Sequence, residues 1–509
     1  MKNKLFLIPL LLIASSHAYS APELNDNIFE KTKILAQHGN IKAQNQLGAM
    51  YFNGTESKQD YVQAMEWIQK AAEQGYDVAQ NNLGVIYFQG LGTQQSDTLA
   101  KGWFQKSAEQ GYAQAQYNLG IMYKEGKGTN KDLTQAKEWF QQAADKGNLD
   151  AQSQLGEMYL KGNGTQKDYA LALKWLQNAA NNNIANAQFN LALMYLDGLG
   201  IEQNHQEALQ WFQKASEQGN TSAQYNLGLM YQNGLGTPRD ISLAKKWYLK
   251  SAQQGHAPSQ NNLGLIYTQG TEKQRNYTAA RELFQSAAEQ NYVLAQYNLG
   301  LMYKDGNGGV KNNEMAIKWL KKAAEQNYSK AQYNLGVLYQ DKQNNQQNYT
   351  LAKEYYQKAA EQNYAPAQNQ LALLYLKGMG TTQNYLLAKE WFLKAAEQNN
   401  VSAQFNLGMM YKNGDGVEKN GKVAQEWLLK AAEQNNASAQ FNLGMMYKNG
   451  DGVEKNGKVA QEWFLKAAEQ NNASAQFNLG MMYKNGDGVE KNEKAAQEWF
   501  QKVEQQKAH

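Results

Sequence analysis

The sequence of 509 residues contains no cysteine, which excludes disulfides, thiolate metal sites, a cysteine nucleophile and a lipid-modified cysteine. Prolines and histidines number only five each, and the histidines share no metal-ligand spacing. Charged residues make up 19% of the chain, and the formal net charge is +4. The sequence contains no run of basic residues that could bind the phosphates of a nucleic acid. The composition therefore argues against disulfide-stapled, metal-binding and nucleic-acid-binding proteins. The 11% of aromatic residues argues against a disordered chain.

Long apolar runs are missing after the first twenty residues. Lys2 and Lys4 precede an apolar run from Leu5 to Ala14, and the small residues Ala18 and Ser20 follow. This order is typical of a secretory signal peptide. An uncleaved membrane anchor is disfavoured, because the apolar run is too short to span a bilayer. We expect cleavage after Ser20, a periplasmic or secreted protein, and no membrane insertion after cleavage.

A 36-residue repeat dominates the sequence. A tyrosine follows each repeat leucine four residues later, and all eleven tryptophans occupy one repeat position. No insertion or deletion interrupts the period. Positions are named below by their numbers in repeat 1, so that position 45 means Asn45 and its equivalents in the other repeats. The repeat leucines are Leu47, Leu83, Leu119, Leu155, Leu191, Leu227, Leu263, Leu299, Leu335, Leu371, Leu407, Leu443 and Leu479.

Each repeat predicts two helices. In the first helix, Ala43, Leu47, Met50 and Tyr51 form one apolar stripe at helical spacing. Gly48 lies inside that stripe, where a glycine weakens the helix but lets a neighbouring helix approach closely. A Gly-x-Gly loop usually follows and ends the first helix.

The second helix carries Ala64, Trp67 and Ala71 on one face and ends at a glycine or an asparagine. These two residue types best tolerate the left-handed conformation of a helix C-cap, so we expect positive φ there. Stacking the helix pairs buries their apolar faces in one continuous solenoid. We expect a signal peptide at 1–20, an N-terminal capping helix at 21–39, thirteen repeats at 40–507 and a tail at 508–509. The expected cap residues are Gly75, Gly111, Gly147, Asn183, Gly219, Gly255, Asn291, Asn327, Asn363, Asn399, Asn435 and Asn471.

The repeat resembles the Sel-one-like repeat family, a branch of the tetratricopeptide-like superfamily. The matching residues in one unit are Ala115, Leu119, Gly120, Tyr123, Gly126, Gly128, Ala136, Trp139, Ala143 and Ala144. The resemblance implies an all-α fold, a right-handed α/α superhelical solenoid of thirteen 36-residue helix-turn-helix repeats whose first helices line a concave groove. It also implies an adaptor that holds protein or peptide partners, and bacterial members of the family are often exported.

We therefore expect a non-catalytic protein-protein interaction scaffold of the bacterial cell envelope, without a cofactor. One alternative is a secreted host-interaction (virulence) factor or a toxin-neutralising immunity factor. A β-lactam-binding or cell-wall-related enzyme is less favoured, because the family branch linked to β-lactams is rich in cysteine. The sequence Ser242 to Lys245 lacks the other elements of a penicillin-binding site. The stretch Asn413 to Gly416 resembles a calcium loop, but Lys422 stands where its last ligand should be.

Partner-binding residues are expected on the groove. Position 45 is aromatic in eight repeats, and aromatic side chains are favoured binding anchors, although core packing is an equally open reading. Position 46 is always an amide, and position 52 adds lysines late in the chain. The amides could instead join neighbouring helices, the lysines could be a solvated face, and the glutamine at position 44 is more readily structural. The candidate residues are Tyr117, Phe189, Tyr225, Tyr297, Tyr333, Phe405, Phe441, Phe477, Asn406, Asn442, Asn478, Lys412, Lys448 and Lys484.

Repeats 7 and 9 depart most from the pattern. Repeat 7 has Glu272 at the second loop glycine, and repeat 9 has neither loop glycine and carries Tyr355 in place of tryptophan. We expect limited proteolysis to cut first between Gln340 and Asn348.

Overall fold

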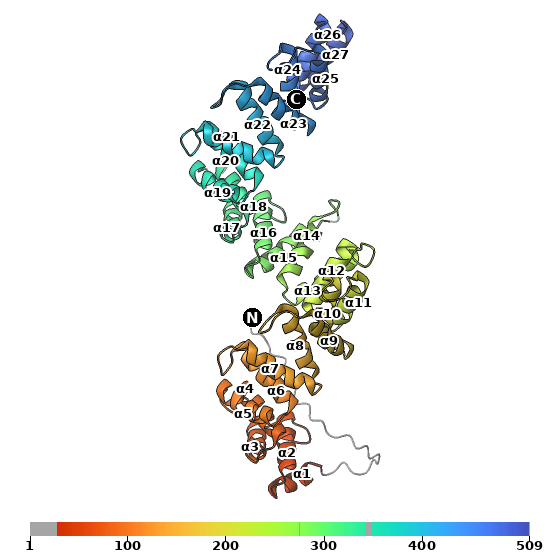
Figure 1. Cartoon of the computed structure of the whole chain (residues 1–509), viewed down its shortest axis with the longest axis vertical. Coiled ribbons are helices and arrows are strands. Elements are labelled where there is room, and N and C mark those ends of the chain that lie inside the picture. The colour runs from red at the N-terminus through yellow and green to blue at the C-terminus, as the bar shows by residue number, and fades with distance from the viewer. Residues whose placement is uncertain (1–27, 274, 342–347, 508–509) are drawn as a thin grey trace. The chain divides into compact units, whose positions relative to one another are not determined.

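The computed structural model describes residues 28–273, 275–341 and 348–507, and within them every regular element is an α-helix (Figure 1). The predicted signal peptide and the C-terminal tail lie outside these residues. The chain divides into two compact units, unit 1 up to Gln254 and unit 2 from Gly255. None of the described helices is both long and apolar enough to cross a bilayer.

The first helix of each repeat spans twelve or thirteen residues. In chain order they are α2 (Ile41–Asn53), α4 (Asp77–Gln89), α6 (Ala113–Glu125), α8 (Leu149–Lys161), α10 (Ala185–Asp197), α12 (Thr221–Asn233), α14 (Ala257–Thr268), α16 (Val293–Asp305), α18 (Ser329–Gln340), α20 (Ala365–Lys377), α22 (Val401–Asn413), α24 (Ala437–Asn449) and α26 (Ala473–Asn485).

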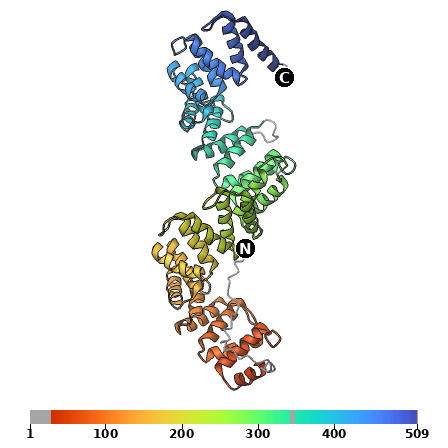
Figure 2. The same ribbon diagram turned by 90° about the vertical axis from the view of Figure 1, so that its right-hand side faces the viewer.

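The second helices alternate with them along the chain, as the ribbon shows from two directions (Figures 1 and 2). They are α3 (Tyr61–Glu73), α5 (Asp97–Glu109), α7 (Leu133–Asp145), α9 (Tyr169–Asn181), α11 (His205–Glu217), α13 (Ile241–Gln253), α15 (Tyr277–Glu289), α17 (Asn313–Glu325), α19 (Tyr349–Glu361), α21 (Tyr385–Glu397), α23 (Gly421–Glu433), α25 (Gly457–Glu469) and α27 (Glu493–Lys507). A leading helix, α1 (Ile28–Gln37), lies within the segment predicted to cap the array and packs on α2.

The core repeats with the sequence. In the packing of α6 on α7, Leu119 is fully buried and Gly120 lies directly under the Phe140 ring. A Cβ on Gly120 would lie 2.7 Å from that ring, so the small residue at position 48 allows the close approach expected from the sequence. Trp139 packs on the core formed by Phe104, Ala108 and Leu119, which joins its repeat to the preceding one. Within each unit, consecutive helix pairs therefore stack into an all-α solenoid.

The predicted left-handed caps are confirmed at every second helix that was expected to have one. The glycines adopt φ between +84° and +91°, and the asparagines between +60° and +67°. Gly75 and Asn183 illustrate the two types, with φ of +90° and +67°. Asparagine can replace glycine there because its short polar side chain tolerates this conformation.

The first helices of repeats 7 and 9 end differently from the others. Elsewhere a left-handed glycine such as Gly54 follows the helix, whereas α14 and α18 are followed by the extended residues Gln269 and Asp341. Residues 342–347, most of the expected cleavage segment, lie outside the described part of the chain. Tyr355 occupies the tryptophan position and stacks on the ring of Tyr339, with 5.8 Å between the ring centroids.

Candidate protein-binding surface

The aromatic residues at position 45 lie on one side of the first helices, which we call the first-helix face and define by positions 45 and 46. Each ring of the pairs below rests against the core ring at position 68 of its own repeat, at 5.8 to 6.0 Å between centroids. Most of these rings are half-buried, and Phe477 is 51% exposed. They therefore contribute to packing and still present an edge to solvent. The pairs are Tyr117–Phe140, Phe189–Phe212, Tyr225–Tyr248, Tyr333–Tyr356, Phe441–Phe464 and Phe477–Phe500.

Tyr297 and Phe405 complete the predicted row. They pack on the clusters that contain Leu320 and Leu428, the aliphatic residues at position 68 in those repeats. Position 68 is thus the common support of the whole row, whether its side chain is aromatic or aliphatic.

Burial raises the pKa of the Tyr117 hydroxyl, and the charges of Asp150 and Glu125 raise it further. Burial also raises the pKa of the half-buried Asp150 carboxyl on α8. Tyr117 therefore stays protonated at neutral pH and can donate a hydrogen bond.

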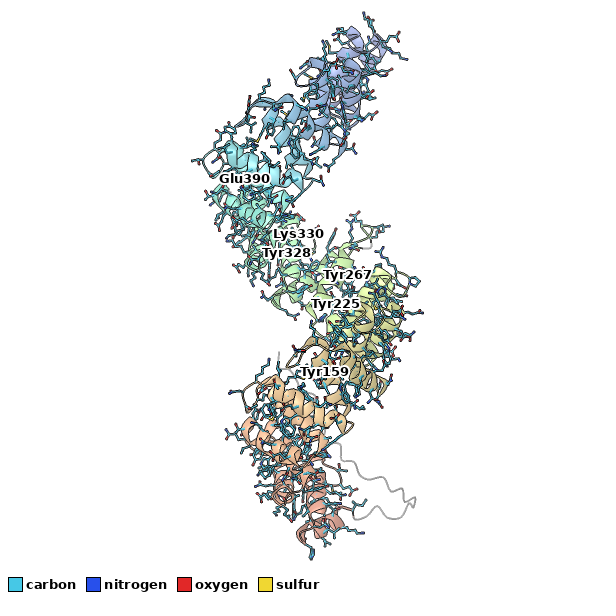
Figure 3. The ribbon with its side chains drawn as sticks, viewed as in Figure 1. Tyr159, Tyr225, Tyr267, Tyr328, Lys330 and Glu390 are labelled. Atoms are coloured by element: carbon cyan, nitrogen blue, oxygen red, sulfur yellow. The ribbon has the colours of Figure 1, made fainter. Side chains whose placement is uncertain are left out.

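Four tyrosines gather on the first-helix face of repeats 8 to 10. Tyr328 stands edge-on to Tyr297 at 5.1 Å, and Tyr364 stands edge-on to Tyr333 at 5.5 Å. Burial raises the pKa of all four hydroxyls, and the proximity of Tyr364 raises the other three further. Tyr328 and Tyr364 immediately precede α18 and α20, at the helix N-cap, and sequence reasoning did not single them out. Figure 3 labels Tyr328 at the start of α18.

The amides at position 46 join neighbouring repeats wherever position 45 of the preceding repeat is asparagine. Asn406 on α22, for example, donates from Nδ2 to Asn369 Oδ1 on α20 at 3.2 Å. This favours the structural reading for those amides. The other bonds of this kind are Asn82 to Asn45, Asn118 to Asn81 and Asn298 to Asn261, at 2.9 to 3.0 Å.

Two of the predicted lysines also act across a repeat junction. Lys412 donates from Nζ to Asn442 Oδ1 at 2.7 Å, and Lys448 donates to Asn478 Oδ1 at 3.1 Å. Lys484 is exposed on α26 and makes no such bond within the described residues. The structure therefore brings together four of the predicted amide and lysine residues, beside the row of rings.

The glutamine at position 44 connects its own helix by hydrogen bonds to the helix before it and to the end of the helix after it. Gln44 donates from Nε2 to the Ala36 carbonyl of the preceding helix at 3.2 Å, and its Oε1 accepts from Gln74 Nε2 at 2.7 Å. Gln44 is 6% exposed, so this position serves the junction, as the structural reading had it. The donor bond recurs at Gln80, Gln116, Gln152, Gln188, Gln224, Gln296, Gln332, Gln368, Gln404, Gln440 and Gln476.

Comparison with known proteins supports this architecture. The Sel1 repeat matches thirteen consecutive segments from residue 41 to residue 503, each except the last 36 residues long. The chain belongs to the Sel1 repeat family. The Sel-one-like resemblance and the all-α repeat fold expected from the sequence are thus confirmed.

Several known proteins are similar to this chain. The crystal structure of c5321, a protective antigen present in uropathogenic Escherichia coli strains, is 34% identical, with 94% of this chain and 95% of that chain covered and a TM-score of 0.55. A Sel1 repeat protein from Oxalobacter formigenes is 32% identical over 61% of this chain and 89% of that chain, with a TM-score of 0.47. The secretory immunoglobulin A-binding protein EsiB of Escherichia coli is 37% identical over 65 residues, which span 13% of each protein.

The weaker motifs of the sequence fall within the ordinary Sel1 repeat. Ala244, between Ser242 and Lys245, is a fully buried core residue of α13. The stretch from Asn413 to Gly416 is the last residue of α22 and the start of the loop after it, with Gly414 and Gly416 in the left-handed conformation. The described residues contain no group of three or more histidine, aspartate or glutamate side chains that could hold a metal ion.

Proposed function

We propose that this Sel1 repeat protein is a non-catalytic scaffold of the bacterial cell envelope that binds a protein or peptide partner along the first-helix face. The observation that carries the proposal is the row of half-buried rings at position 45. Each ring is fixed from below by a core side chain and keeps an edge toward solvent. Rigid aromatic side chains bury a large area on binding at a small entropic cost, which makes them effective anchors.

The tyrosines of repeats 8 to 10 and the phenylalanines of repeats 11 to 13 support the proposal in different ways. Tyr328 and Tyr364 widen the row with hydroxyl groups that can bond a partner's backbone. Phe405, Phe441 and Phe477 offer apolar edges, beside Met409 and Met445, which are partly buried in the same clusters. Methionine adapts its shape to irregular apolar surfaces.

The cell-envelope location is part of the proposal. It rests on the signal-like order of the first twenty residues, with cleavage after Ser20. Fractionation of cells that express a tagged chain, with sequencing of the mature N-terminus, tests it. A cytoplasmic, unprocessed protein would contradict it.

A second candidate function is recognition of a host protein by a secreted or surface-displayed chain. The similarity to c5321 over almost the whole of both chains favours it, because c5321 is described as a protective antigen of uropathogenic strains. The short match to an immunoglobulin A-binding protein supplies secretory immunoglobulin A as a defined probe.

A triple replacement tests the first-helix face. We expect Phe405→Ala, Phe441→Ala and Phe477→Ala together to lower the affinity for the partner at least tenfold. Helicity, measured by circular dichroism, should stay nearly unchanged. If helicity and melting temperature collapse instead, the rings serve the core. The candidate partners are secretory immunoglobulin A and proteins identified by cross-linking in envelope extract.

Cross-linking from defined positions identifies the binding face. A photoreactive phenylalanine analogue in place of Phe477, 51% exposed on the first-helix face, should trap the partner. The same analogue in place of Leu386, 71% exposed on the second helix α21, is the matched control. Equal trapping from both positions would place the partner elsewhere.

A further inference from the structure

A cavity of about 620 Å³ opens between the loops of repeats 11 and 12 in unit 2. Lys412 and Lys419 line it from repeat 11, together with Gly421 at the start of α23. Asp451 and Gly452 line it from the loop of repeat 12. The walls thus carry two ammonium groups and one carboxylate.

A glycine at position 61 leaves this space open. In repeat 10 the same position is Tyr385, whose side chain lies against Gly416 in the loop of the next repeat. In repeat 11 the backbone of Gly421 lies against that of Gly452, with no side chain on either residue. The exchange of tyrosine for glycine therefore removes a ring from the space that the two lysine side chains line.

The positive charge in the cavity exceeds the negative charge. Lys412 donates a hydrogen bond to the neutral amide of Asn442, and no hydrogen bond or ion pair of the described residues engages Lys419. Burial lowers the pKa of Lys412, the Asp451 carboxylate raises it, and the charge of Lys419 lowers it by a smaller amount. An added anion would relieve the repulsion between the two lysines.

The arrangement occurs again one repeat later. Residues 403–438 and 439–474 differ only at Leu428 and Phe464, so Lys448, Lys455 and Gly457 repeat the set. Lys448 donates to Asn478 as Lys412 does to Asn442, and Gly457 lies against Gly488.

Unit 1 provides an independent example at the same register. A cavity of about 480 Å³ is lined there by Lys124 and Lys131, which occupy the repeat positions of Lys412 and Lys419. Lys127 adds a third ammonium group, which forms an ion pair with Glu125 at 3.0 Å, and Lys124 lies 3.9 Å from the carboxylate of Glu157. Lys131 is the lysine of this cavity without a hydrogen bond or ion pair among the described residues, and Leu133 stands at position 61, so the lysine register recurs in unit 1 without the glycine of repeat 11.

We propose that the two lysine pairs of repeats 11 to 13 bind two carboxylate side chains of an extended acidic segment of the protein partner. This inference rests on the proposed scaffold function and names the partner's chemistry. Packed helices lie about 10 Å apart. A polyproline II segment rises about 3.1 Å per residue and returns to the same side every third residue, so acidic residues at i and i+3 match the spacing of the two lysine pairs.

Peptide titration of the full mature chain tests the proposal. The probe is a fluorescent peptide of serine, proline and glycine with glutamates at i and i+3. Its binding is measured by fluorescence anisotropy at low salt. We expect the double variant Lys419→Gln/Lys455→Gln to weaken binding at least tenfold, because each pocket loses its exposed cation. The control Lys422→Gln/Lys458→Gln removes the same charge from exposed residues of the same repeats that do not line the cavity, and should change affinity less than twofold.

Three outcomes would overturn the proposal. These are no binding to the wild-type chain, equal weakening by the pocket and control variants, and equal affinity for a peptide whose glutamates are adjacent. The same experiments distinguish failure of this proposal from failure of the scaffold function. If a cross-linked partner still depends on Phe405, Phe441 and Phe477 but not on Lys419 and Lys455, the scaffold proposal stands and the acidic-segment proposal does not.

Discussion

Repeats 11 to 13 and the irregular repeats 7 and 9 share a core and differ at the end of the first helix. In the former group, α24 has thirteen residues and is followed by left-handed Gly450, with φ of +80°. In the latter, α14 and α18 have twelve residues and are followed by the extended Gln269 and Asp341. Yet Gly336 lies under the ring of Tyr356 in repeat 9 just as Gly444 lies under Phe464 in repeat 12.

This comparison separates two determinants of the repeat. The contact between positions 48 and 68 holds the helix pair together and survives a poor loop. The loop affects only how the first helix ends: left-handed Gly450 follows α24 directly, whereas in repeat 7 the equivalent Gly270, also at positive φ, comes after the extended Gln269. A solenoid of this kind therefore tolerates loop variation as long as the small residue and its covering side chain remain.

The largest expected difference between the two regions is in proteolysis. We expect a protease at low concentration to cut first between Gln340 and Asn348 and to leave two helical fragments, with the loops of repeats 11 to 13 cut later. Mass spectrometry of the fragments over time gives the order. Early cutting elsewhere, with repeats 7 to 9 resistant, would break the comparison.

A substitution at the shared core contact should affect both regions alike. Gly444→Val and Gly336→Val each place a branched side chain where a Cβ alone would lie 2.5 to 2.6 Å from a ring, and we expect destabilisation of about 1–3 kcal/mol. Denaturant unfolding of the full chain, with hydrogen exchange of α18 and α24, measures it. The controls are Gly444→Ala and Gly336→Ala, because Ala192 and Ala372 occupy this position natively and are fully buried. A penalty in repeat 12 alone would show that the irregular repeat has a looser core.

The smallest expected difference concerns the residue that follows the first helix. Gly450→Ala should cost about 1 kcal/mol, because alanine is strained at positive φ. Gln269→Ala should change stability by less than about 0.5 kcal/mol, since its extended backbone suits any residue. Hydrogen exchange in the last turns of α24 and α14 reports both. Equal effects would mean that cap conformation does not distinguish the two groups.

Much of the fold was predictable because each element repeats. Thirteen copies of one pattern show which positions are always apolar and which are always small. The alternation of glycine and asparagine after the second helix has one simple physical reading, and the φ values at Gly75 and Asn183 confirm it. The altered helix end of repeat 9 accompanies the loss of both loop glycines, whereas repeat 7 keeps Gly270 at φ of +94° and its first helix still ends one residue earlier.

The candidate surface was predictable only in part. The sequence identified Tyr297 and Tyr333 but not Tyr328 and Tyr364, because a residue that precedes a helix has no place in a helical stripe. The pairing of Lys412 with Asn442 joins residues thirty positions apart, and no local pattern shows which side chains meet across a junction. The opening at Gly421 is likewise visible only beside the loop of the next repeat. Binding by the predicted residues remains a prediction.

The hydrogen bonds of the glutamines at position 44 affect the conditions under which the repeats stay packed together. Gln44 and Gln74 are neutral amides, and so are their counterparts in most other repeats, such as Gln404 and Gln434. Amides do not titrate in the range in which carboxylates and histidines do, and bonds between uncharged groups are little weakened by added salt. Cohesion between repeats at these points is therefore independent of acidity and ionic strength, which would suit the cell-envelope location proposed above.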